Sequence, residues 1–77
     1  MGKITEIATI EAPKALGPYS QGIVTGELLF ISGQIGLIPQ TGELVEGGLS
    51  FQTNQVLDNI AAICGAAGTS LQHIVKL

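Results

Sequence analysis

The sequence has no arginine, only three lysines, and one residue each of cysteine and histidine among its 77 residues. A single cysteine, Cys64, cannot form an internal disulfide, and one cysteine with one histidine makes a poor set of metal ligands. The lysines, at positions 3, 14 and 76, are scattered, and the net charge is −3. These absences argue against a nucleic-acid partner, because phosphate binding needs clustered lysine and arginine.

Long apolar runs are missing as well. The first residues contain no apolar stretch of signal-peptide type, and no run approaches the ~18 apolar residues of a membrane span. We therefore predict a soluble, cytoplasmic protein with no membrane partner. Only 12% of the residues are charged and 45% are hydrophobic. A single small domain of this composition usually hides part of its surface in an oligomer.

Three stretches have the pattern of β-strands. Residues 4–10 alternate apolar and polar side chains, which is typical of a strand with one covered face. A second strand is predicted at residues 21–24 and a central one at residues 28–32. Residues 25–27 form a tight connection, so these two strands should pair antiparallel.

One helix is predicted at residues 50–67, with Ser50 as its N-cap and Gly68 just beyond its C-terminus. The break at residues 47–48 precedes it, and a turn is predicted at residues 38–43. Its apolar stripe follows the helical spacing, and polar side chains occupy the other side. The stripe comprises Phe51, Val56, Leu57, Ile60, Ile63, Cys64 and Ala67; the polar side comprises Gln52, Gln55, Asp58 and Asn59.

A further strand is predicted to begin at residues 73–77. The resulting βββαβ order leaves much of a sheet uncovered and its last strand unfinished. We therefore expect this chain to be the N-terminal part of a longer fold.

Candidate site residues gather at the end of the central strand and in the loop at residues 14–21. The Gly33 N–H and the Ser32 hydroxyl could bind a carboxylate, with Gln34 on the same rim; alternatively, Gly33 serves only a bulge or strand exit. Tyr19, beside Gly17 and Pro18, could direct its phenol at a ligand or merely anchor its loop. Cys64 is expected to be a small buried side chain of the helix, and His73 is expected to be structural or exposed.

Several blocks of this sequence, in order, resemble the Rid proteins, the reactive intermediate deaminases also called the YjgF-like family. The blocks are APKALGPYSQ at residues 12–21, FISGQI at 30–35, PQTGELV at 39–45, QTNQVLDNI at 52–60 and AAGTSL at 66–71. The resemblance covers essentially the whole chain.

The resemblance implies an α+β, chorismate-mutase-like fold with a mixed sheet and helices packed on one face. Residues 1–77 would form one such domain, incomplete at its C-terminus. Family members form homotrimers around a central barrel, with ligand clefts between subunits. They hydrolyse enamines and imines, such as 2-aminoacrylate, 2-iminobutanoate and 2-iminopropanoate, to 2-oxo acids and ammonia without a cofactor.

Carried over to this sequence, the resemblance makes Tyr19 a catalytic residue near the reacting carbon and Gly33 the donor of an N–H to the substrate. Ser32 and Gln34 would shape the same wall. The family's carboxylate-binding arginine and its water-positioning acid lie beyond residue 77. The alternative to a deaminase is therefore a non-catalytic protein, either a small-ligand-binding or a chaperone-like oligomer. An acidic chain without arginine does not support ribonuclease activity, which is known for some relatives.

Overall fold

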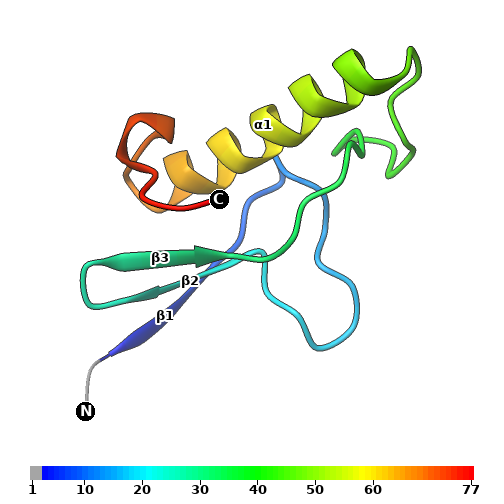
Figure 1. The fold of residues 1–77 in the computed structure, drawn as a ribbon. Coiled ribbons are helices and arrows are strands. Elements are labelled where there is room, and N and C mark those ends of the chain that lie inside the picture. The colour runs from blue at the N-terminus through cyan, green and yellow to red at the C-terminus, as the bar shows by residue number, and fades with distance from the viewer. Residues whose placement is uncertain (1–2) are drawn as a thin grey trace.

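The computed structural model describes residues 3–77 as an antiparallel sheet with one helix lying across it (Figure 1). The strands pair in the order β1-β2-β3. The elements are β1 (Ile4–Ile7), β2 (Gly22–Thr25), β3 (Leu28–Ile31), α1 (Leu49–Ala66) and a short 3-10 helix η1 (Leu71–His73). The α+β fold class is thus confirmed, and every strand pairing within residues 3–77 is antiparallel.

Helix α1 covers only one of the two faces of the sheet. A Cβ added to Gly22 would lie 3.1 Å from Cγ2 of Ile63, so Gly22 faces the helix. Leu29, whose Cδ1 would lie 3.3 Å from the same Cβ, shares that face. Because side chains alternate along a strand, Ile23 and Phe30 point to the other face, where they lie opposite each other in the β2–β3 register.

The uncovered face is mostly apolar, and the register places Glu6 and Thr25 on it as well. Its large side chains are 53–66% exposed at Ile4, Leu28 and Phe30. We call Ile4, Ile23, Leu28 and Phe30 the open sheet face. This surface is the kind that a small domain of low charge would hide in an assembly.

Strand β3 was predicted to be central, and that prediction is wrong for the described chain. Strand β2 lies in the middle, and β3 pairs with β2 alone. The apolar run at residues 28–31 indicated a strand buried on both sides, but its composition cannot specify its neighbours. Ser32 follows β3, and its N–H still donates to the Gln21 carbonyl at 3.1 Å.

Strand β1 ends at Ile7 rather than at residue 10. Ile7 pairs with Gly22, the first residue of β2, so the backbone ladder ends there. Beyond it the Gln21 side chain takes the place of a neighbouring strand. Its Oε1 accepts from the Thr9 N–H at 2.6 Å, and its Nε2 donates to the Thr9 carbonyl at 3.0 Å.

Helix α1 begins one residue before the predicted start, and its N-cap is Gly48 rather than Ser50. Gly48 has φ 88°, and its carbonyl accepts the first helical bond, from the Gln52 N–H at 3.0 Å. Ser50 lies inside the first turn, where no side-chain cap bond forms. The helix therefore starts at a glycine of positive φ and not at a serine whose hydroxyl caps the first turn.

The predicted C-terminal end of α1 is confirmed. Gly68, at φ 86°, follows the cap residue Ala67. The Gly68 N–H donates to the Gly65 carbonyl at 3.0 Å, and the Thr69 N–H to the Cys64 carbonyl at 2.9 Å. This pair of bonds is the Schellman motif, which satisfies the last carbonyls of a helix.

The buried stripe of α1 is narrower than predicted. Ile63 and Cys64 are buried, whereas Phe51 is 59% exposed. Asn59, predicted on the polar side, is fully buried. Its Nδ2 donates to the carbonyls of Ile35 at 3.2 Å and Leu37 at 3.0 Å, because α1 packs on that segment as well as on the sheet.

The predicted strand at residues 73–77 is absent from the described chain, where η1 is followed by irregular backbone. Residues 74–77 have no strand beside them to form backbone hydrogen bonds with, and a strand is stable only when paired.

The turn predicted at residues 38–43 is confirmed by two hydrogen bonds, both 2.8 Å long. The Gly42 N–H donates to the Ile38 carbonyl, and the Ile38 N–H donates to the Glu43 carbonyl. Leu37 and Leu44 then form a single antiparallel bridge. Within residues 3–77, no helix has the length and apolar character to cross a membrane.

Candidate functional site

Two segments distant in sequence form the walls of one open hollow of about 380 Å³. The first is the loop between β1 and β2, and the second is the chain that leaves β3. In Figure 1 the two segments lie on the same side of the sheet, beyond the end of β3. The hollow brings together all four predicted site residues: Tyr19, Ser32, Gly33 and Gln34.

Ser32 joins the two walls. Its hydroxyl donates to the Ser20 carbonyl, and its own N–H donates to the Gln21 carbonyl at 3.1 Å. The hydroxyl hydrogen is therefore engaged within the protein, and Ser32 can offer a ligand only an oxygen lone pair. Gln34 strengthens the same wall, because its Nε2 donates to the Ser32 carbonyl at 3.1 Å.

Gly33 exposes a bare stretch of backbone to the hollow. Within residues 3–77 its N–H donates to no acceptor, and a Cβ added to it would meet no atom within 4 Å. Its φ is outside the left-handed region, so this position requires no glycine for conformational reasons. The physical consequence of glycine here is open access to a free N–H donor.

Tyr19 is 71% exposed, and its hydroxyl has no protein partner among residues 3–77. Its N–H donates to the Leu16 carbonyl at 3.4 Å across the Gly17-Pro18 turn. The turn thus sets where the tyrosine leaves the backbone and keeps its ring on the rim of the hollow. The phenol is free to donate or accept one hydrogen bond.

Gln21 has a structural role that the sequence reasoning missed. The side chain is 6% exposed, and besides Thr9 its Nε2 contacts the carbonyls of Ala12 at 3.2 Å and Pro13 at 2.8 Å. One amide therefore holds residues 9–13 and, through them, the loop that carries Tyr19. Hydropathy could not reveal this role, since glutamine is usually exposed; its place between a proline-containing loop and a strand was the available signal.

The hollow has no acidic wall. Of its lining residues within 3–77, Lys14 alone carries a charge. A second hollow, about 530 Å³, is also lined by Lys14 and Gln21, together with Glu6. Among the described residues, no group of three or more His, Cys, Asp or Glu side chains could hold a metal ion.

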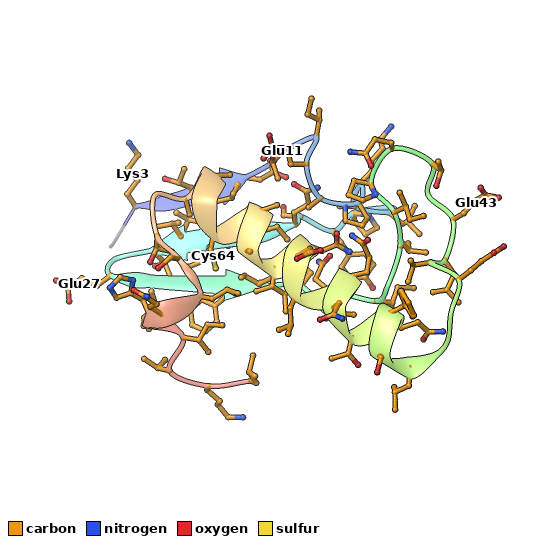
Figure 2. The ribbon with its side chains drawn as sticks, turned by 90° about the horizontal axis from the view of Figure 1, so that it is seen from above. Lys3, Glu11, Glu27, Glu43 and Cys64 are labelled. Carbon is orange, nitrogen blue, oxygen red and sulfur yellow. The ribbon has the colours of Figure 1, made fainter. Side chains whose placement is uncertain are left out.

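Cys64 and His73 do not line either hollow. Cys64 is 3% exposed, and Figure 2 shows it where α1 overlies the sheet. Three labelled carboxylates, Glu11, Glu27 and Glu43, lie at the periphery in the same view, and all three residues are exposed. His73 is exposed, and its Nδ1 lies 3.2 Å from Thr69 Oγ1.

Comparison with known proteins places this geometry in a family. Residues 9–77 match the family model described as Endoribonuclease L-PSP. The solved structure of RidA from an Antarctic Psychrobacter superposes with a TM-score of 0.83 at 50% identity, covering 88% of this chain and 55% of that one. The chain belongs to the Rid family. The resemblance seen in the sequence blocks is thereby confirmed.

Two curated Rid relatives illustrate the similarity. A RutC family protein from Pyrococcus horikoshii is 55% identical over 71 residues, which cover 92% of this chain and 56% of the relative. A human 2-iminobutanoate/2-iminopropanoate deaminase is 44% identical over 70 residues, which cover 91% of this chain and 51% of the relative. The chain thus spans about half the length of the curated relatives it matches.

Proposed function

We propose that this Rid protein hydrolyses small enamines and imines, such as 2-aminoacrylate, 2-iminobutanoate and 2-iminopropanoate, to 2-oxo acids and ammonia. The observation that carries the proposal is the hollow itself, where the unpaired Gly33 N–H and the free Tyr19 hydroxyl lie on facing segments. The name of the human relative, a 2-iminobutanoate/2-iminopropanoate deaminase, supports the substrate class.

The reaction needs little covalent help from the protein. An enamine first gains a proton at its terminal carbon and loses one from nitrogen, which converts it to an imine. Water then adds through its oxygen to the imine carbon, and a proton passes to nitrogen. The proton of the new hydroxyl group also passes to nitrogen, the C–N bond breaks, ammonia leaves, and a C=O group remains. Because the imine carbon is already electrophilic, holding the substrate and water in place supplies most of the catalysis.

The four site residues have distinct proposed roles. The Gly33 N–H would donate to the substrate, while the Tyr19 phenol would hydrogen-bond near the reacting carbon. Ser32 and Gln34 would keep the wall rigid, a role supported by the bonds from Ser32 to the Ser20 and Gln21 carbonyls and from Gln34 to the Ser32 carbonyl. No cofactor enters this scheme.

We also propose that the protein works as a homotrimer with ligand clefts between subunits. The open sheet face supports this proposal, since Phe30 is 59% and Leu28 53% exposed in a single chain. The carboxylate-binding arginine and the water-positioning acid that the family resemblance implies lie beyond residue 77, so a second copy of residues 1–77 would not supply them.

Imine trapping tests the proposed function. A threonine dehydratase generates 2-iminobutanoate, semicarbazide captures it, and the rate of semicarbazone formation reports how long the imine survives. The purified protein should lower that rate in proportion to its concentration, and the Tyr19→Phe variant should lower it less. An unchanged imine lifetime would exclude deaminase activity.

A second candidate function is a non-catalytic, small-ligand-binding or chaperone-like oligomer. The lack of arginine together with the open sheet face favours it. Calorimetric titration with 2-oxobutanoate separates the two. No heat from a folded trimer, identified by sedimentation, favours the chaperone-like function; heat without imine hydrolysis favours ligand binding alone.

The description of the matching family model names an endoribonuclease. For this chain the charge favours deamination over RNA cleavage, because three scattered lysines and a net charge of −3 provide no phosphate-binding surface. RNA cleavage is therefore not proposed.

A further inference from the structure

We propose that Lys14 determines the charge preference of the hollow, drawing the carboxylate of a small 2-oxo or 2-imino acid toward the Gly33 N–H. This inference rests on the proposed function, which it deepens by naming a residue that selects anionic over neutral ligands. Lys14 lines the hollow together with Tyr19, Ser32 and Gly33.

The backbone that leads into Lys14 is held in place even though the side chain is exposed. The buried Gln21 amide contacts the carbonyls of the two preceding residues, Ala12 and Pro13. Ala12 is itself 2% exposed, and the proline ring fixes its own φ. The lysine therefore starts from a fixed point on the backbone that borders both hollows.

The one charge on the lining favours an anion, and the nearby Glu6 carboxylate is engaged by the hydroxyl of the lining residue Ser20 at 2.7 Å. Within residues 3–77, Lys14 is the one charged lining residue, although the whole chain is acidic at −3. The other ligand-binding groups available here, the Gly33 N–H and the Tyr19 hydroxyl, can also donate to a carboxylate. Ile35 and Leu37 add an apolar part to the lining. A short apolar body that ends in a carboxylate matches this combination.

A lysine provides attraction of a particular kind. Its ammonium is a hydrated point charge, whereas an arginine would hold a carboxylate through two parallel bonds. An exposed lysine therefore changes affinity modestly, and added salt should weaken its effect. Both properties give the proposal a measurable signature.

The test compares two ligands of equal size, 2-oxobutanoate and the uncharged 2-oxobutanamide. Binding to the purified protein is followed by ¹H–¹⁵N NMR titration, with the Gly33 amide as the reporter. Lys14→Met should weaken 2-oxobutanoate binding about two- to five-fold at low salt and leave 2-oxobutanamide binding unchanged. Lys14→Arg, which keeps the charge, should bind 2-oxobutanoate like the parent protein.

Lys3→Met is the matched control, because Lys3 is also exposed but lies on the chain before β1, outside both hollows. It lowers the net charge equally and should leave both affinities unchanged. At an ionic strength of about 0.5 M, the difference between the parent protein and Lys14→Met should shrink.

Three results would overturn the inference: equal 2-oxobutanoate affinities for Lys14→Met and the parent protein, equal losses for both ligands, or no shift of the Gly33 amide in the parent protein. Lys14→Gln, a second uncharged variant, is measured alongside, so that a loss of binding caused by misfolding of Lys14→Met alone can be recognised.

Imine trapping separates this inference from the proposed function. Hydrolysis with unchanged Lys14→Met binding would overturn the inference alone, whereas Lys14-dependent binding without hydrolysis would overturn the function alone.

Discussion

At the residue scale, two amide side chains hold the segments that surround the hollow. Gln21 binds the loop at residues 9–13, and Asn59 binds the carbonyls of Ile35 and Leu37 from the helix. Both side chains are buried, and within residues 3–77 no buried side-chain nitrogen or oxygen lacks a partner. Such groups stabilise a fold because their loss would leave backbone atoms unpaired away from water.

Replacing Gln21 with leucine should therefore destabilise the protein by about 2–3 kcal/mol, because the Thr9, Ala12 and Pro13 backbone groups would lose their partner. Urea denaturation followed by circular dichroism measures the effect as a lower midpoint at constant slope. Gln40→Leu is the control; Gln40 is exposed and its substitution should change stability by less than about 0.5 kcal/mol. Equal midpoints for the two variants would show that the Gln21 bonds contribute no net stability.

Gly33→Ala should separate binding from stability. The added methyl group meets no atom within 4 Å and φ is outside the left-handed region, so the unfolding free energy should stay the same or rise by a few tenths of a kcal/mol. The methyl group would stand beside the free N–H, so 2-oxobutanoate binding and imine hydrolysis should fall several-fold. Calorimetry and thermal unfolding on one preparation measure both quantities, and unchanged binding would remove Gly33 from the site.

At the element scale, α1 is the part whose local sequence predicted most. Its length and its C-terminal glycine followed from helical spacing and from cap chemistry. The residues of its buried side could not be predicted in the same way, because the polarity of Asn59 indicated an exposed side chain. The helix packs on the segment at residues 35–37 as well as on the sheet, and only that contact explains a buried amide.

Gly65, within α1, and Gly68, just beyond its C-terminus, should respond in opposite directions when each is replaced by alanine. Gly65 lies within α1 with nothing within 4 Å of an added Cβ, so Gly65→Ala should stabilise the fold by about 0.5–1 kcal/mol. Gly68 has φ 86°, where a side chain is strained, so Gly68→Ala should destabilise it by about 1–2 kcal/mol. Thermal unfolding of both variants checks the pair; a stabilised Gly68→Ala would contradict the Schellman ending.

At the scale of the whole molecule, the described chain leaves an apolar surface without a cover. Helix α1 lies on one face of the sheet (Figure 1), and the open sheet face of Ile4, Ile23, Leu28 and Phe30 has no layer above it. A three-stranded sheet with one helix has few other places to bury these side chains. Assembly with further copies offers the simplest way to remove them from water.

The variant Phe30→Asp should therefore dissociate the proposed trimer, because three carboxylates would be placed within the shared interface. Sedimentation velocity measures the change in mass. Val75→Asp is the control: Val75 is 89% exposed but lies near the C-terminus, outside the sheet. A trimer that persists in Phe30→Asp would show that the open sheet face is not the interface.

The sequence by itself determined the features that depend on near neighbours. Alternation predicted the first strand, the residues 25–27 connection predicted an antiparallel hairpin, and Gly68 predicted the helix end, because each depends on a few consecutive residues. The blocks at residues 12–21 and 30–35 also identified the family. Tyr19, Ser32, Gly33 and Gln34 could be named as candidates because they stand next to turn residues at the ends of predicted elements.

Tertiary structure alone decided which distant segments meet. It placed β2 rather than β3 in the middle of the sheet, stopped β1 at Ile7, and left the residues after His73 outside any strand. It also buried Gln21 and Asn59 and brought Lys14 to the hollow. Each outcome depends on contacts between residues far apart in the chain, which local propensity and hydropathy do not encode.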